Sequence, residues 1–142
     1  MLQSNSHFSF TVSINNTIEK VWETLINVPT WHLWDTELIE AKLNGNFEAG
    51  ATGTMIPKSG PKLKFYISEV TIHKSYTINT IMPIGELVIK RNLTQNGNKV
   101  DFTDDIQFTG FLKSIFGLML GKKFKEVLPE VLNKFKIIAE SK

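Results

Sequence analysis

The sequence contains no cysteine. This absence excludes disulfide bridges, thiolate nucleophiles and cysteine-ligated metal sites. The three histidines, His7, His32 and His73, lie far apart, and none has a partner at the spacing of metal ligands. No glycine-rich phosphate loop and no nucleophile motif occurs. We therefore expect a protein that holds no metal and uses no cofactor.

The chain also has little net charge and no long apolar run. Its formal net charge is +2, and its lysines and arginines are scattered, which argues against a nucleic-acid partner. No uncharged apolar stretch reaches the roughly 18 residues of a transmembrane helix. The first ten residues lack the basic region and apolar run of a signal peptide. A cytoplasmic protein without a transmembrane segment is the expectation.

What the sequence does have is the composition of an ordinary globular domain. It has 142 residues, of which 42% are hydrophobic and 21% charged. This length is enough for one domain with its own core. No internal repeat, low-complexity tract or linker interrupts the chain. We therefore expect residues 1–142 to form a single domain.

The most regular pattern follows Gly121. Apolar residues recur there at spacings of three and four with charged residues between them, which predicts an amphipathic helix. Its apolar stripe consists of Phe124, Val127, Leu128, Val131, Leu132, Phe135, Ile138 and Ala139. Pro129 removes a backbone donor and is expected to kink or divide this helix near Leu128. The apolar segment 110–121 is predicted to form a short helix or turn before it.

Most of the remaining chain is predicted to be strand. Residues 7–14 alternate between apolar and polar side chains, as in a half-buried strand. A short helix capped by Thr17 follows, and a second one capped by Thr30. Further strands are expected at residues 38–43, 53–57, 63–72, 76–82, 86–93 and 100–108. Short connections predict an antiparallel sheet, which would curl around the C-terminal helix with the two short helices at one end.

Asn96-Gly97 gives the strongest hairpin signal in the chain. A two-residue turn there would place Leu93 opposite Val100, Arg91 opposite Phe102, and Ile89 opposite Asp104. Strand alternation then puts Arg91 and Asp104 diagonally on one mostly apolar face. A buried charge costs several kcal/mol unless it is paired. The two residues are therefore either a polar pair lining a cavity, or a structural ion pair near an open end, unless a bulge turns one outward.

The order of these elements resembles the helix-grip fold of the START-like (SRPBCC) superfamily, and the local sequence resembles its polyketide cyclase/dehydrase branch. The matching stretches are 21–22, 28–31, 34–35, 43–45, 47–54 (FEAGATGT), 57–70 (PKSGPKLKFYISEV) and 108–140. The resemblance covers about Phe8 to Glu140. It implies an α+β fold in which an antiparallel sheet of about six or seven strands wraps a long C-terminal helix. It also implies a cavity between sheet and helix, where members of the superfamily bind apolar molecules.

The resemblance and the strand alternation together predict the residues that bind a ligand. They are Trp31, Trp34, Tyr76, Ile89, Arg91, Phe102, Asp104, Phe108, Phe116, Phe124 and Leu128. Trp31 and Trp34 could form a lid or simply pack the second short helix against the sheet. Phe116 could lie at the cavity mouth, contact a membrane transiently, or belong to the core.

For function, we expect binding, transport or sensing of a small hydrophobic molecule such as a lipid, polyketide or aromatic metabolite, because apolar lining outweighs placed chemistry. One alternative is a cofactor-free cyclase or dehydratase, whose acid, base or hydroxyl could come only from Asp104, Arg91, Tyr76, His32 or Glu86. His32 beside Asp35 could act as a base or form an ordinary surface contact. The other alternative is a protein-interaction module such as a chaperone activator. Converging acid and base groups in the cavity would favour the enzyme, and a cavity too small for a ligand would favour the interaction module.

Overall fold

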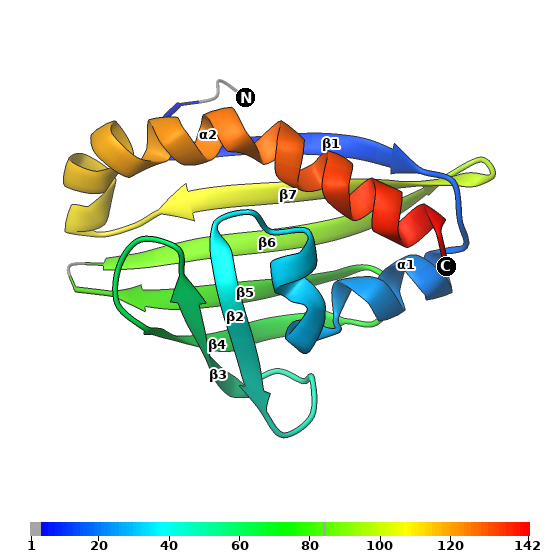
Figure 1. Cartoon of the computed structure of the whole chain (residues 1–142), viewed down its shortest axis with the longest axis horizontal. Helices are drawn as coiled ribbons and strands as arrows, with labels where there is room; N and C mark the ends of the chain where they lie inside the picture. The colour runs from blue at the N-terminus through cyan, green and yellow to red at the C-terminus, as the bar shows by residue number, and fades with distance from the viewer. Residues whose placement is uncertain (1–3, 84) are drawn as a thin grey trace.

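The computed structural model describes residues 4–83 and 85–142, and for residues 112–120 it describes the backbone only. In these residues, seven strands and three helices follow one another along the chain (Figure 1). They are β1 (His7–Ile14), α1 (Ile18–Leu25), the 3-10 helix η1 (Val28–Leu33), β2 (Leu38–Asn44), β3 (Thr52–Pro57), β4 (Leu63–Thr71), β5 (Ser75–Met82), β6 (Gly85–Asn96), β7 (Lys99–Phe108) and α2 (Phe111–Glu140).

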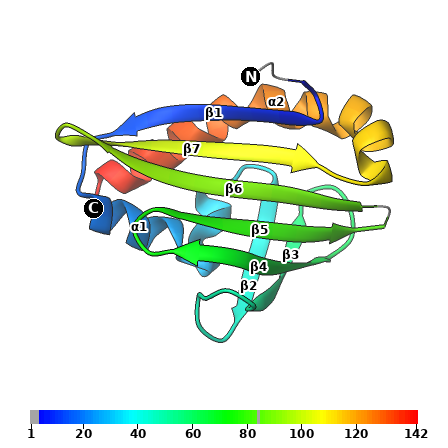
Figure 2. The same ribbon diagram turned by 180° about the vertical axis from the view of Figure 1, so that it is seen from behind.

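The strands form one antiparallel sheet in the order β1-β7-β6-β5-β4-β3-β2. The sheet curves strongly, so that β2 and β3 cross in front of β5 in Figure 1, and α2 lies along the concave face. Figure 2 shows the uncovered convex face from behind. Helix α1 lies beside the C-terminal end of α2. The expected α+β arrangement of a curved antiparallel sheet around the C-terminal helix is therefore confirmed.

The predicted apolar stripe of the C-terminal helix is its buried side. Five of its members are buried, namely Leu128, Val131, Leu132, Phe135 and Ala139. The ring of Phe135 lies 4.9 Å from that of Trp34 and 4.8 Å from that of Phe102, measured between centroids. Burying each large apolar side chain stabilises the fold by about 1.5–3 kcal/mol. The stripe therefore holds the helix on the sheet.

The start of this helix was predicted wrongly, because it begins at Phe111 rather than near Gly121. A kink or a division was expected at Pro129, and of these the division does not occur, because the helix continues through that residue. Leu128 and Val131 on either side of Pro129 are both buried against the sheet. This packing keeps both turns in place, although the proline removes one backbone hydrogen bond. Within the described part of the chain, no helix is long and apolar enough to cross a membrane.

The two short helices begin in different ways. The Thr17 side chain accepts a hydrogen bond from the Lys20 amide at 3.3 Å, so the predicted cap of α1 is confirmed. The second helix begins at Val28 rather than after Thr30, and Pro29 lies in its first turn. Proline is well tolerated there because the first turn of a helix has no intrahelical partner for its amides. The Thr30 hydroxyl instead donates to the Asn27 carbonyl at 2.8 Å.

The β6–β7 hairpin differs from its predicted register by two residues. Asn96 pairs with Lys99, so the turn residues are Gly97 and Asn98, and Arg91 lies directly opposite Asp104. Gly97 has a φ of 64° and occupies the first central position, which is typical of a type II′ turn. A shift of two residues leaves every side chain on its predicted face. The inward orientation of Arg91 and Asp104 is therefore confirmed, whereas their diagonal placement was wrong.

Candidate ligand-binding site

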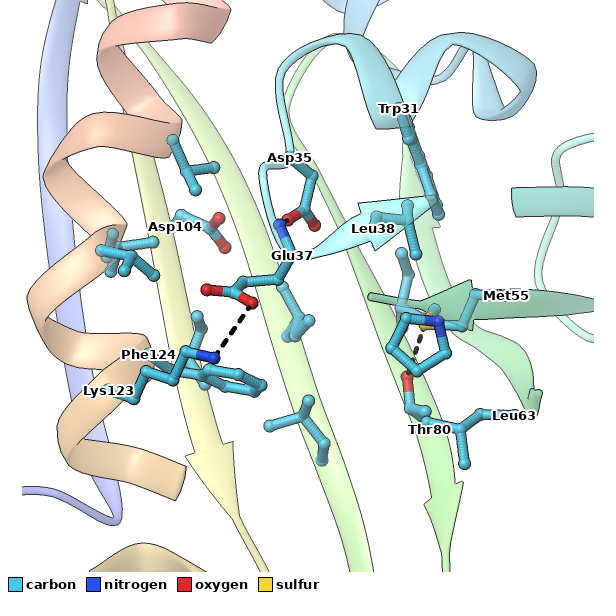
Figure 3. A pocket seen from close by; sticks show the side chains of 18 of the residues that line it. Trp31, Asp35, Glu37, Leu38, Met55, Leu63, Thr80, Asp104, Lys123 and Phe124 are labelled. Atoms are coloured by element: carbon cyan, nitrogen blue, oxygen red, sulfur yellow. Dashed lines mark hydrogen bonds and ion pairs between the residues drawn. The ribbon is translucent and has the colours of Figure 1, made fainter. Parts of the chain in front are cut away.

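A cavity of about 160 Å³ lies between the concave face of the sheet and α2. Its walls are mostly apolar, and Figure 3 shows many of the side chains that line it. The apolar lining comprises Trp31, Leu38, Met55, Pro57, Leu63, Ile78, Met82, Leu87, Ile89, Ile106, Phe124, Val127, Leu128 and Val131. An apolar cavity of about 150 Å³ can hold a molecule the size of benzene. The space therefore suits a single ring or a short chain.

Strand alternation explains how the sheet supplies this lining. Successive side chains point to opposite faces, so every second residue of a strand reaches the concave side. On β5 these residues include Ile78 and Thr80, and on β6 they include Ile89 and Arg91. The facing wall comes from α2, where Phe124 and Leu128 are four residues, or about one turn, apart.

One end of the cavity is polar because Arg91 and Asp104 meet there. Both are buried, with exposed fractions of 3% and 2%. Arg91 Nε lies 3.7 Å from Asp104 Oδ1, which is too long for a hydrogen bond. Among the described residues, neither atom has a hydrogen-bond partner. Leaving a buried polar atom without one costs about 1–3 kcal/mol, so this end of the cavity has unused hydrogen-bonding capacity.

Several aromatic residues fix the Arg91 guanidinium in place. Its Nη1 donates to the Tyr76 hydroxyl at 3.0 Å, and that hydroxyl donates to the Leu25 carbonyl at 2.9 Å. Its central carbon lies 5.0 Å from the ring centroid of Trp31 and 4.8 Å from that of Trp34, within the range of cation–π attraction. Burial raises the pKa of Tyr76 to about 12, so its hydroxyl keeps its proton at neutral pH.

A second carboxylate, Asp35, lines the same end of the cavity (Figure 3). It follows η1 and accepts a hydrogen bond from the Glu37 amide at 3.1 Å. Burial raises the pKa of Asp35, and the Arg91 guanidinium opposes that rise. Burial also raises the pKa of Asp104 to about 6, again against the influence of Arg91 and with a further increase from Asp35. Two carboxylates thus compete for one guanidinium.

An ion pair bridges the segment after η1 and helix α2. Glu37 Oε2 lies 3.7 Å from Lys123 Nζ, and both residues line the cavity (Figure 3). The Glu37 carbonyl also accepts a hydrogen bond from the Lys58 amide at 3.0 Å, which ties this segment to the β3–β4 connection. The Lys123 side chain is 55% exposed, so the pair lies where the cavity meets solvent. Such a pair is worth at most about 1 kcal/mol and can open readily.

No family model matches the sequence, and no curated protein matches it either. Solved structures do match. A START superfamily protein from Mycobacterium smegmatis superimposes with a TM-score of 0.77 and 11% identity, over 95% of this chain and 97% of that one. The chain has the START-like fold. The helix-grip fold expected from the sequence is thereby confirmed.

Two further structures with the START-like fold are named for specific proteins. The di-domain ARO/CYC StfQ from the steffimycin biosynthetic pathway matches with a TM-score of 0.75 and 11% identity, over 96% of this chain and 51% of StfQ. Ara h 8.0201 matches with a TM-score of 0.73 and 9% identity, over 96% and 98% of the two chains. The chain also spans about half the length, 48%, of DynU16, a protein in the dynemicin biosynthetic locus that is 14% identical with a TM-score of 0.69. At these identities the likeness concerns the fold alone.

The structure brings six of the predicted site residues together on the cavity wall. They are Trp31, Ile89, Arg91, Asp104, Phe124 and Leu128. Four others, Trp34, Tyr76, Phe102 and Phe108, are buried in the core outside this wall. Trp34 and Phe102 pack on Phe135, and Phe108 lies near Phe124. These four side chains do not line the cavity, because they pack against other core residues. Phe116 lies outside the residues whose side chains are described.

The sequence analysis missed several residues of the wall. The period of two from Tyr76 would have found Ile78, Thr80 and Met82, and the helical period would have found Val127 and Val131. Asp35 was considered only as a neighbour of His32. His32 is exposed, whereas Asp35 is half-buried and lines the cavity. No local pattern places Asp35 there, because its position depends on how the segment after η1 packs across the sheet.

The contribution of Asp104 to stability is expected to decrease as the pH rises through about 6. Its pKa is raised in the folded state above the ordinary value of 3.8, so the folded protein binds the proton more tightly than the unfolded chain. The resulting stabilisation is fully present below about pH 4 and is lost above about pH 6. Urea titrations of the wild type and Asp104→Asn between pH 4 and pH 7.5 measure it. The wild type should lose stability relative to the variant across this range, and a constant difference would contradict the assignment.

Proposed function

We propose that the protein binds a small, largely apolar molecule in the cavity between the sheet and α2. The observation that carries this proposal is an apolar space of about 160 Å³ with a buried ion pair at one end. Two atoms of this pair, Arg91 Nε and Asp104 Oδ1, have no hydrogen-bond partner among the described residues. Binding sites for small molecules typically combine apolar walls with a few placed polar groups. The START-like fold supports the proposal as an analogy, since StfQ is named as a protein of a biosynthetic pathway.

The size of the cavity limits the affinity of a ligand that lies wholly inside it. A single ring buries about 200 Å² of apolar surface, which contributes about 5 kcal/mol at 25 cal/mol per Å². This corresponds to a dissociation constant of about 0.1–1 mM. A larger ligand would gain affinity by extending past Glu37 and Lys123 toward solvent.

The polar end would orient the ligand. Asp104 Oδ1 can accept a hydrogen bond and Arg91 Nε can donate one, and both atoms lack partners among the described residues. A ligand that pairs with these atoms removes their desolvation cost, whereas a purely apolar ligand leaves it in place. The preferred ligand is therefore an apolar body with one polar group.

Filling the cavity is expected to abolish binding. Toluene should bind the wild type with a dissociation constant of about 0.1–1 mM. Leu128→Trp should weaken this binding at least tenfold, because Leu128 lines the cavity and is buried. Ligand-detected NMR titration, with circular dichroism to establish that the variant is folded, measures the effect.

The matched control is Ile137→Trp on the same helix, where the side chain is 69% exposed. It should leave toluene binding unchanged. A smaller enlargement, Val127→Phe on the half-buried part of the wall, serves if Leu128→Trp does not fold. Equal binding by all variants would place toluene on the outer surface, and absence of binding to the wild type would refute the proposal.

A second candidate function is proton transfer on a bound carbonyl compound. It is favoured by the raised pKa of Asp104, about 6, which suits a general base near neutral pH. Asp104 would remove a proton next to the carbonyl, and Arg91 Nε would stabilise the enolate oxygen. The test is exchange of the methyl protons of acetophenone for deuterium in D₂O. Exchange faster than in buffer, and lost in Asp104→Asn, would establish it. Exchange no faster than in buffer would refute this candidate and leave ligand binding as the proposed function.

A further inference from the structure

The cavity has more negative than positive groups. Among its described lining residues, three are carboxylates, namely Asp35, Glu37 and Asp104, and two are cations, namely Arg91 and Lys123. Glu37 and Lys123 form an ion pair with each other at 3.7 Å. This leaves Asp35 and Asp104 to face the single guanidinium of Arg91. One negative charge at the polar end of the cavity is therefore unbalanced when both carboxylates are ionised.

Arg91 is poorly placed to satisfy both carboxylates. Its Nη1 is committed to the Tyr76 hydroxyl at 3.0 Å, and its guanidinium is held against the rings of Trp31 and Trp34. Its Nε approaches Asp104 Oδ1 only to 3.7 Å. Among the described residues, Asp104 Oδ1 thus remains a buried acceptor without a hydrogen-bond partner. Within the described part of the chain, no cationic donor therefore lies within hydrogen-bond distance of this oxygen.

Three kinds of polar group differ sharply in how they would meet this need. A protonated amine donates up to three hydrogen bonds and supplies the missing positive charge. A hydroxyl donates one and supplies no charge. A carboxylate adds another negative charge and donates nothing when ionised. Hydrogen bonds between an ammonium and a carboxylate are about twice as strong as neutral ones.

We propose that the cavity is selective for small apolar amines, with the ammonium group against Asp104 and Asp35 and the apolar body against the wall formed by the sheet and α2. This inference rests on the proposed binding function and specifies its ligand class. It excludes fatty acids and other apolar anions as preferred ligands.

A proton is the amine's competitor at this site. Burial raises the pKa of both Asp35 and Asp104, the latter to about 6, so below that pH Asp104 is neutralised without a ligand. Among the described residues, the charged or titratable groups that face Asp104 are Arg91 from β6, Tyr76 from β5 and Asp35 from the segment after η1. Asp105 points to the opposite face of β7, where its carboxylate pairs with His7 at 3.0 Å. Glu37 and Lys123 lie farther out at the mouth. Amine affinity should therefore increase as the pH rises from 5 to 7.5, while the amine itself stays protonated.

The test uses three probes with one carbon skeleton: benzylamine, benzyl alcohol and benzoate. Each is titrated into the wild type at pH 7.5 and low ionic strength by NMR or calorimetry. Benzylamine should bind at least tenfold tighter than benzyl alcohol, and benzoate should bind more weakly than either. Asp104→Asn and Asp35→Asn should each weaken benzylamine binding about tenfold and change benzyl alcohol binding less than threefold. Two separate variants keep the test valid if one of them does not fold.

The controls separate failure of this inference from failure of the proposed function. If toluene and benzyl alcohol bind but benzylamine binds no tighter, selectivity for amines is refuted and apolar binding stands. If benzylamine binding survives Leu128→Trp, the amine lies outside the cavity and the inference is refuted. If binding is lost in Glu37→Gln rather than in Asp104→Asn and Asp35→Asn, the amine lies away from the polar end and the inference is also refuted. If toluene and all three probes fail to bind, the proposed function is refuted as well.

Discussion

Replacing Phe135 with alanine is expected to lower the free energy of unfolding by about 3–5 kcal/mol. Phe135 is fully buried, and its ring contacts those of Trp34 and Phe102. These two neighbours come from the end of η1 and from β7, so the ring joins α2 to two other parts of the fold. Its removal leaves a void that they can close only by moving away from their own partners. The lost free energy therefore has two parts, namely the transfer free energy of the ring from water to the core and the cost of the void that the ring leaves.

Urea denaturation followed by circular dichroism measures this loss. The matched control is Phe111→Ala, which deletes the same ring from the first residue of the same helix, where it is 75% exposed. The control should change stability by no more than about 0.5 kcal/mol. A loss below about 1 kcal/mol for Phe135→Ala would show that the helical stripe is not the main contact between α2 and the sheet.

Arg91→Met is expected to destabilise the protein by about 3–5 kcal/mol at neutral pH. The substitution keeps an unbranched apolar stem but removes the guanidinium, which is the only cation at the polar end of the cavity among the described residues. Asp104 and Asp35 would then be carboxylates without a compensating charge, and the Tyr76 hydroxyl would lose the donor at 3.0 Å. The loss should be smaller at pH 5 than at pH 7.5, because Asp104 is then protonated in the folded protein.

A double-mutant cycle distinguishes the lost pairing from lost packing. Adding Asp104→Leu to Arg91→Met should recover part of the stability, because the uncompensated carboxylate is then gone. The coupling energy between the two sites should be about 1–3 kcal/mol. Additive losses would mean that the 3.7 Å approach of the two side chains carries no net interaction.

The same two residues link stability to the proposed function. An ion pair that is buried without a direct hydrogen bond stabilises a fold less than apolar residues of similar volume would. In this chain it lies on the wall of the cavity rather than in the packed region around Phe135. Strain or unsatisfied polarity of this kind is expected where a protein recognises a ligand. The amine titrations therefore test ligand recognition at this site, and the double-mutant cycle tests the contribution of the same site to stability.

Local patterns in the sequence determined the elements of the fold and the faces of the strands. The helical period after Gly121 and the alternation along residues 86–93 and 100–108 place buried side chains at fixed intervals. Because the strand period is two, Arg91 and Asp104 were placed correctly on the concave face although the hairpin register was wrong by two residues. The order of elements then limited the chain to a sheet wrapped around one helix, as in the START-like fold.

Tertiary structure alone decided where the cavity lies and which groups share it. Trp34, Phe102 and Phe108 were predicted to line it but fill the core beside it, because the packing of large rings depends on neighbours from distant strands and from α2. Asp35 reaches Arg91 and Asp104 only through the path of the segment after η1 across the concave face. Such contacts join residues far apart in the chain, and no period of two or 3.6 residues encodes them. The sequence therefore predicted a hydrophobic cavity and left open whether Arg91 and Asp104 line it or form a structural ion pair. The folded chain placed both on the cavity wall and added the second carboxylate, Asp35.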